Sequence, residues 1–337
     1  MLTKDTAFKP SEDILRPNDA VFTNPIGEKE SPDPFVTYDD VYKRYYLLFT
    51  RGREVRIFSS PTLSTLRNEE NGVKVYGIEQ NDGIFGSIWA PEMHKIDGKW
   101  YIYTSGARTL DGREDRTLFV LASKTDDPLD GFTFAGFPDP SINAIDPTVY
   151  RHSDGKLYMC YAREGKGNRL HIRKMKSPTA FDGEGILLCE AELDWEKLPP
   201  YVGDSTIVEG AFFVQSPNKE RLFILYSANG CWSDEYAIGV LEYKGGELVN
   251  KDSWEKDLVP LFKKGNGTFG PGHASYFLCP DKETLYIAYH SMHESNKTVT
   301  WAPRYLHVQK VYFDSTGFPY IGQPLPMGKS VGICQMK

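Results

Sequence analysis

The chain has 337 residues, 40% of them apolar and 25% charged, values ordinary for a globular protein that buries a substantial core. Its net charge is -7 and Lys and Arg form no cluster, which argues against a nucleic-acid partner. It has no run of 18 apolar residues and no apolar signal core after Met1. We therefore expect no membrane partner, and a cytoplasmic location for the sequence as given, or a secreted or periplasmic one if a signal peptide was trimmed.

The chain contains an odd number of cysteines, and none of them lies in a Cys-x-x-Cys pair. This pattern disfavours both a disulfide framework and a zinc site. We expect buried free thiols, the usual state of an unpaired cysteine. The five residues are Cys160, Cys189, Cys231, Cys279 and Cys334.

Five seven-residue segments align without gaps along the chain, about 55 to 65 residues apart, and each has an aromatic residue at its third position. Short apolar, aromatic-rich runs of this kind predict strands that are buried on both faces. The segments are RYYLLFT (44–50), KWYIYTS (99–105), KLYMCYA (156–162), RLFILYS (221–227) and TLYIAYH (284–290).

Turn signals precede these segments, among them the Asp97-Gly98 and Asp154-Gly155 hairpin turns, and no long amphipathic helix separates them. A period of about 60 residues with several strands per unit is typical of propeller blades. The alternative, a β-sandwich, has no reason to repeat one pattern five times. We predict an all-β protein, a single five-bladed β-propeller domain over residues 1–337. The first 30 residues and the tail after Asp314 are expected to help close the ring.

A distinctive residue lies 12 to 14 positions before the central aromatic of each repeat. The first strand of each propeller blade lines the axis, so these five residues are expected to converge on one ring. They are Asp33 in SPDPF, Trp89 in SIWAPE, Asp146 in AIDPT, Glu209 in IVEGA and His273 in GPGHAS.

Three carboxylates in one ring raise each other's pKa, an arrangement that usually serves chemistry. Glycoside hydrolysis needs one protonated carboxyl to donate to the leaving oxygen and one ionised carboxylate to activate water or attack the sugar. Trp89 offers a flat face on which a sugar stacks, or else packs in the core. A single Asp-Pro pair would indicate only a turn, but Asp33-Pro34 and Asp146-Pro147 share one phase of the repeat with Glu209.

Together these motifs, with SIWAPEMHKIDGKWYIYTSG, IDPTVYRHSDGKLYMCYA and WAPRYLHVQKVYFDSTGFPY, resemble glycoside hydrolase family 43 from about Asp33 to Gly322. The resemblance implies an inverting mechanism. In it, Asp33 is the general base, Glu209 is the general acid and Asp146 orients the acid and adjusts its pKa. Arg304 matches an arginine that reaches the sugar or a catalytic carboxylate, unless it forms only a surface ion pair.

The resemblance also implies a role for His273, which in arabinan-cleaving members coordinates calcium or another ion through a mostly water shell. Such an ion would be structural, because neutral imidazole is a poor ligand for a hard cation. A histidine that only hydrogen-bonds within the ring is the alternative, and no cofactor is required for the chemistry. Many members have Pro where this chain has Ala211, which puts the subfamily in doubt and not the role of Glu209.

The family acts mainly on α-L-arabinofuranosides and β-D-xylosides. The chain ends soon after its fifth repeat, without the extra sandwich of many β-xylosidases, which favours an α-L-arabinofuranosidase acting on a carbohydrate partner such as arabinan or arabino-oligosaccharides. A β-D-xylosidase, an endo-arabinanase and a non-catalytic glycan-binding propeller remain alternatives. Fructan-cleaving enzymes and phosphorylases are disfavoured, because their Arg-Asp-Pro, Glu-Cys and phosphate-binding features are missing. Further polar candidates for the pocket are His94, Arg108 and His293.

Overall fold

The computed structural model describes residues 2–10, 20–110, 115–165, 167–198, 206–298 and 300–333. Regular structure in this part of the chain is almost entirely strand, and its helices are short 3-10 turns such as Pro128–Asp130. No helix among the described residues has the length and apolar character needed to cross a bilayer.

Most strands belong to units of four, in which consecutive strands pair antiparallel in chain order. The first unit is β2 (Phe35–Asp39), β3 (Arg44–Leu48), β4 (Glu54–Ser60) and β5 (Gly72–Gly77). The second is β6 (Ile88–Ile96), β7 (Lys99–Ala107), β8 (Arg116–Ser123) and β9 (Phe132–Gly136). The third is β10 (Ala144–Arg151), β11 (Leu157–Arg163), β12 (Gly167–Ser177) and β13 (Ala180–Cys189).

The fourth unit is β14 (Thr206–Gln215), β15 (Leu222–Ala228), β16 (Ala237–Tyr243) and β17 (Trp254–Lys256). The fifth is β18 (Phe269–Leu278), β19 (Leu285–Met292), β20 (Tyr305–Phe313) and β21 (Pro319–Tyr320). The five repeated segments of the sequence are thus the second strands of these units, as predicted: β3, β7, β11, β15 and β19.

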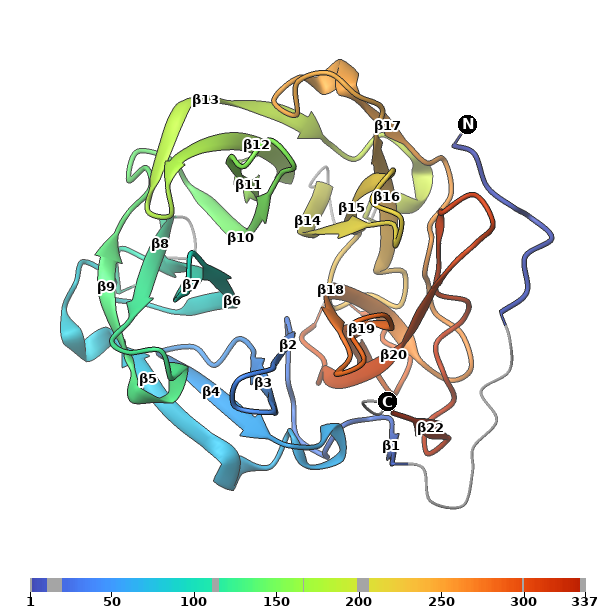
Figure 1. Ribbon diagram of the computed structural model, residues 1–337, viewed down its shortest axis with the longest axis horizontal. Helices are drawn as coiled ribbons and strands as arrows, with labels where there is room; N and C mark the ends of the chain where they lie inside the picture. Colours follow the sequence, from blue (N-terminus) through green and yellow to red (C-terminus); the bar gives the residue numbers. More distant parts are fainter. Residues whose placement is uncertain are drawn as a thin grey trace.

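The sheets surround a common centre, and β2, β6, β10, β14 and β18 lie nearest to it (Figure 1). This all-β propeller architecture is the one that the repeat predicted. Parallel pairing of Gly167 with Thr206 and of Asn168 with Ile207 joins the third and fourth units into one eight-stranded sheet. The count of five blades, and the single domain, therefore stay predictions from the repeat.

A segment near each end of the chain packs beside the fifth unit. β1 (Val21–Thr23) pairs antiparallel with β22 (Ser330–Gly332), and the Ile26 N–H donates to the Leu306 carbonyl at 2.8 Å. Glu30 forms a further bridge with Tyr305. These pairings agree with the expectation that both ends help to close the ring.

The core is divided into clusters, each of which lies between two neighbouring units. Each second strand is covered on both faces by such clusters, which explains why the repeat is apolar without alternation. The aromatic third residue of every repeat packs into one of these clusters. These residues are Tyr46, Tyr101, Tyr158, Phe223 and Tyr286.

Candidate active site

A cavity of about 470 Å3, the acidic cavity, lies where the innermost strands meet. Six of the residues predicted from the sequence line it, although they come from segments up to 271 residues apart. Thr50, Asn168, Trp232 and Trp301 also contribute to its wall. The six predicted residues are Asp33, Trp89, Asp146, Glu209, His273 and Arg304.

In every innermost segment the backbone is left-handed either at the distinctive residue or at the residue that follows it. The φ angles are 57° at Asp33, 44° at Ala90, 54° at Asp146, 55° at Gly210 and 46° at His273. In β6, β10, β14 and β18 the strand register shifts around this position, as at a β-bulge. Left-handed non-glycine residues are strained, and such strain gathers at functional sites.

This regularity corrects one detail of the sequence prediction, which placed all five distinctive residues at equivalent positions. Asp33, Asp146 and His273 are themselves the left-handed residues, whereas Trp89 and Glu209 each precede one. Glycine is favoured at position 210, because its φ is left-handed and a Cβ there would lie 3.1 Å from the His273 ring. The sequence could not show this offset, since the spacing to the repeat varies from 12 to 14 residues in any case.

The backbone N–H groups at three of these positions are held by the seventh residue of a repeat. The Ala90 N–H donates to Thr50 Oγ1 at 2.8 Å, and the His273 N–H donates to Ser227 Oγ at 2.7 Å. The Asp33 N–H donates to His290 Nδ1 at 3.0 Å. The last residue of the repeated segment therefore supports the axial residue of the next unit around the ring.

Asp33 is surrounded by groups that favour its ionised form. Arg304 Nη1 donates to Asp33 Oδ1 at 2.8 Å, and Thr50 Oγ1 donates to Oδ2 at 2.7 Å. His273 Nδ1 lies 3.4 Å from Oδ1. Burial by itself raises the pKa of Asp33, but the positive charges of Arg304 and His273 outweigh it and hold the pKa well below its usual range.

Glu209 and Asp146 have the opposite electrostatics. Burial raises the pKa of Glu209, although its carboxylate accepts from Asn168 Nδ2 at 2.8 Å and from the Tyr236 hydroxyl at 2.9 Å. Burial, together with the charges of Glu209 and Asp33, raises the pKa of Asp146 to about 8 against the effect of His273. The Asp146–Glu209 pair therefore holds a proton at neutral pH, next to an ionised Asp33.

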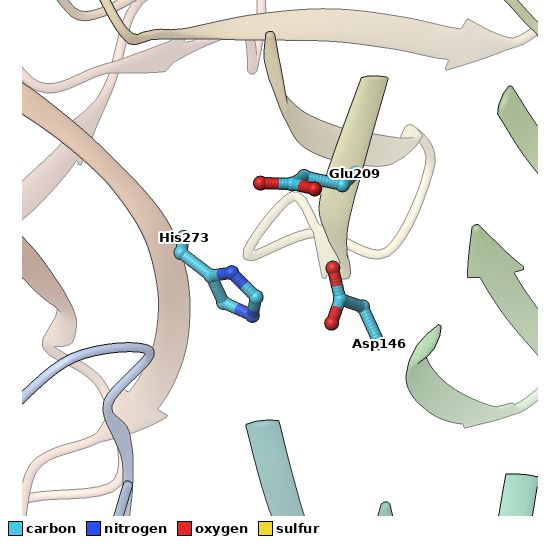
Figure 2. Close-up of side chains that lie close together, drawn as sticks. All are labelled: Asp146, Glu209 and His273. Atoms are coloured by element: carbon cyan, nitrogen blue, oxygen red, sulfur yellow. The ribbon is translucent and has the colours of Figure 1, made fainter. Parts of the chain in front are cut away.

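The side chains of Asp146, Glu209 and His273 point toward one another (Figure 2), with one ligand atom of each within 4.8 Å of the others. They fit a calcium site poorly, because calcium takes six to eight oxygen ligands. Both oxygens of Glu209 already accept hydrogen bonds, and Asp146 Oδ2 accepts the Gly210 N–H at 3.2 Å. Burial lowers the pKa of His273, but the three carboxylates outweigh it and raise that pKa above its usual value.

Trp89 forms one side of the cavity, and a buried arginine lies behind it. The Arg116 guanidinium carbon lies 3.1 Å from the centre of the Trp89 ring, and Arg116 Nη1 donates to the Ser87 carbonyl at 2.9 Å. Arg116 is 2% exposed, so this cation–π contact is largely desolvated and fixes the ring. The indole is thus held as a rigid wall of the cavity.

The other polar candidates lie outside this cavity. His94 pairs with Glu92 at 2.8 Å and stacks on Phe212 beside a separate cavity of about 370 Å3. Arg108 donates to the Pro140 carbonyl at 2.6 Å. His293 lines another cavity, of about 450 Å3, and Trp301 lies in the walls of both this cavity and the acidic cavity.

The cysteines agree in part with the prediction of buried free thiols. Cys160, Cys189 and Cys279 are buried and in no disulfide, while Cys231, also in no disulfide, is only half-buried and lines the acidic cavity. Cys334 lies outside the described residues. Burial raises the pKa of the Cys231 thiol to about 12, which makes it a weak nucleophile.

Several residues of the site were missed in the sequence. Thr50, Ser227 and His290 all occupy the seventh position of a repeat, so the alignment of the repeats held a signal for them. Asn168 and Tyr236 hydrogen-bond to Glu209 from β12 and from the loop before β16, and no sequence signal marks either one. His290 is fully buried, and burial lowers its pKa to about 3, so it supports Asp33 as a neutral ring.

Comparison with known proteins gives one consistent result. An extracellular exo-α-(1→5)-L-arabinofuranosidase of Streptomyces avermitilis is 30% identical over 325 residues, which are 91% of this chain and 64% of that enzyme. This chain thus spans less than two thirds of that relative's length. Alpha-L-arabinofuranosidase B of Pyricularia oryzae is 29% identical over 97% of this chain and 68% of its own length.

The crystal structure of an α-L-arabinofuranosidase from Lactobacillus brevis has the same fold, with a TM-score of 0.79 and 26% identity. The match covers 91% of this chain and 98% of that one. The sequence profile of glycosyl hydrolases family 43 matches residues 22–319, nearly the whole propeller. The chain therefore belongs to glycosyl hydrolases family 43.

Proposed function

We propose that the protein is an inverting α-L-arabinofuranosidase that removes terminal arabinofuranosyl residues from arabinan or arabino-oligosaccharides. The observation that carries this proposal is the electrostatic asymmetry of one cavity. Asp33 is held ionised by Arg304, while the facing Asp146–Glu209 pair retains a proton. Inverting glycosidases need one group in each of these two states.

Asp33 is proposed as the general base. Its low pKa keeps the carboxylate ionised, and each oxygen has a lone pair beyond those used by Thr50 and Arg304. The carboxylate takes a proton from a water molecule while the water oxygen attacks the anomeric carbon. Arg304 and Thr50 fix the orientation of the carboxylate, and His273 adds positive charge at 3.4 Å.

Glu209 is proposed as the general acid. It gives its proton to the glycosidic oxygen as the bond from that oxygen to the anomeric carbon breaks. The like charges of Asp146 and Glu209 oppose loss of the last proton from this pair, and the hydrogen bond that Asp146 accepts from the Gly210 N–H fixes the peptide that follows the acid. After turnover, Glu209 regains a proton from solvent and Asp33 loses one.

The substrate assignment is supported by the relatives, two of which are named as arabinofuranosidases and one of those as exo-acting and extracellular. Those names favour a carbohydrate substrate and a secreted enzyme over a cytoplasmic one. The proposed chemistry uses no cofactor. Any ion at His273 would be structural and held mostly by water.

A β-D-xylosidase or an endo-arabinanase would use the same three carboxylates, so these activities are the second candidates. A non-catalytic glycan-binding propeller is less well supported, because the cavity keeps both an ionised and a protonated carboxyl. Burying these carboxyl groups costs free energy, and sugar binding alone does not require them to be buried.

The test is hydrolysis of 4-nitrophenyl α-L-arabinofuranoside, 4-nitrophenyl β-D-xyloside and α-1,5-arabinobiose by the wild type and Glu209→Gln. We expect the arabinofuranosides to be preferred, and the variant to lose at least about a hundredfold in kcat/KM on arabinobiose. The loss in kcat/KM on the nitrophenyl arabinofuranoside should be smaller, because its leaving group departs with little help from a general acid. NMR of the first-formed sugar should show the inverted anomer.

Preference for the xyloside would move the assignment to the second candidate. Retention of the anomeric configuration would remove the roles given to Asp33 and Glu209. If the wild type cleaves none of these substrates and isothermal calorimetry still detects binding of arabinobiose, the protein is a glycan-binding propeller.

A further inference from the structure

Trp301 stands between two cavities. It lines the acidic cavity, and it also lines a neighbouring cavity of about 450 Å3 whose wall includes His293, Glu294 and Tyr305. The indole is 63% exposed, unusual for so large an apolar side chain. The ring therefore borders both spaces at the rim of the site.

The two faces of this ring differ. The Arg304 guanidinium carbon lies 4.2 Å from the ring centre and covers one face, and the same guanidinium binds Asp33. The ring's high exposure leaves its other face open. A sugar that leaves the acidic cavity therefore meets an aromatic surface already braced from behind.

Hydrogen bonds and ring stacking hold the wall of this neighbouring cavity, the second cavity, in place. The buried Asp234 accepts hydrogen bonds from Ser295 Oγ and from the Asn296 N–H, both at 2.5 Å, which ties the segment before Trp301 to the loop after β15. His293 stacks on Tyr305 with ring centres 4.1 Å apart. These contacts organise the wall, and the exposed Glu294 adds an acceptor of the kind that binds sugar hydroxyls.

We propose that Trp301 and the second cavity form a binding site for the leaving-group side of an arabino-oligosaccharide. The terminal arabinofuranose occupies the acidic cavity, the next sugar stacks on the open face of Trp301, and the sugar after it enters the cavity beside His293 and Glu294. Oligosaccharides of three or more units are then better substrates than arabinobiose. This inference rests on the proposed function and names the part of the chain that selects substrate length.

The test compares kcat/KM on α-L-arabinofuranosyl fluoride, which has no leaving-group sugar, with kcat/KM on α-1,5-arabinobiose and arabinotriose. We expect wild type to prefer arabinotriose over arabinobiose. Trp301→Ala should lose about tenfold on both oligosaccharides and less than about twofold on the fluoride, the size of a lost stacking contact. Trp301→Phe should keep most of the activity, and Glu294→Ala should lose about threefold on arabinotriose alone.

Tyr320→Ala is the matched control, because Tyr320 is also an exposed aromatic but lies on the edge strand β21 against Phe8. It should leave all three substrates unchanged. An equal loss by Trp301→Ala on the fluoride and on arabinotriose would mean that Trp301 acts only through Arg304, and the inference would be wrong. No loss on any substrate would also overturn it.

The failure of the proposed function gives a different result. If the wild type does not hydrolyse the fluoride or either oligosaccharide, the arabinofuranosidase assignment fails and the leaving-group site fails with it. If Trp301→Ala does not fold by circular dichroism, Glu294→Ala carries the comparison. Equal activity of Glu294→Ala and wild type on arabinotriose would then reject the site.

Discussion

The Asp146 carboxylate accepts a hydrogen bond from the Gly210 backbone N–H at 3.2 Å, and so holds the peptide directly after Glu209. At three other axial positions, a side chain from the seventh residue of a repeat accepts this N–H. In the third repeat the seventh residue is Ala162, which offers no acceptor. Asp146 fills this place, so it positions the peptide after the proposed acid, and its carboxylate also interacts with Glu209, whose charge adds to the effect of burial in raising the pKa of Asp146.

Asp146→Asn is expected to separate these two effects, because the amide oxygen still accepts the Gly210 N–H while the charge is lost. Without Asp146 to oppose ionisation of the pair, its last proton is lost at lower pH, so the alkaline limb of the pH profile of kcat/KM moves to lower pH by about one unit. Activity at the optimum should fall about tenfold to a hundredfold. The measurement is kcat/KM on arabinobiose between about pH 4 and 9.

Asp146→Ala is the companion variant, because it removes both the charge and the acceptor. It should show the same shift of the limb with a larger loss of kcat. An unchanged alkaline limb in both variants would remove Asp146 from any role in setting the pKa of Glu209.

Arg304→Met is expected to move the acid limb of the profile to higher pH. Arg304 lowers the pKa of Asp33, so its removal lets burial raise that pKa, and the proposed base becomes protonated at a higher pH. At about pH 5 the loss in kcat/KM should therefore exceed the loss at about pH 7. The profile on arabinofuranosyl fluoride isolates this effect, because that substrate makes no contact with the leaving-group site.

Arg221→Met provides the control for losing an arginine–carboxylate pair elsewhere in the fold. Arg221 Nε donates to Glu242 at 2.8 Å, and neither residue lines the acidic cavity. This variant should lose stability without moving either limb. A similar shift in both variants would point to a general loss of structure in place of a local effect on Asp33.

Gly210→Ala is expected to lower both stability and activity. A Cβ there meets a left-handed φ of 55° and lies 3.1 Å from the His273 ring, so the strain and the clash add. We expect about 2 kcal/mol or more of lost unfolding free energy in urea. The His273 ring should also shift, with a loss in kcat.

Gly155→Ala supplies the matched comparison for the backbone strain. Gly155 has a φ of 81° in a hairpin turn, and nothing lies within 4 Å of the place that a Cβ would occupy. This variant should lose only about 1 kcal/mol of unfolding free energy and keep full activity. Equal losses in the two variants would show that the contact with His273 contributes nothing.

Removal of divalent ions is expected to leave the activity within about twofold of its starting value. The proposed chemistry uses only proton transfer between carboxyl groups, water and the sugar, so no ion takes part in it. Activity and melting temperature should be measured after dialysis against EDTA, and again with calcium restored. A loss that calcium reverses would instead assign a hydrated ion to the neighbourhood of His273.

Much of this protein could be predicted from local pattern. Segments such as 44–50 and 284–290 repeat the same apolar run, because each second strand is buried on both faces in the same radial geometry. The acidic residues of the site could be predicted because they precede the repeated segments by nearly the same number of residues. Closeness in sequence was a poor guide in the case of His94. It lies five residues after Trp89, yet it lines a separate cavity together with Phe212.

The sequence alone determined the periodicity, which shows where the strands lie and which carboxylates precede them at nearly the same distance. The tertiary structure decided which groups touch. Asp33 meets Arg304 across 271 residues, and Tyr236 and Asn168 reach Glu209 from two other segments. A local pattern carries no information about such distant approaches. The opposite pKa shifts of Asp33 and Asp146 arise from them, because burial and neighbouring charge exist only once the ring has closed.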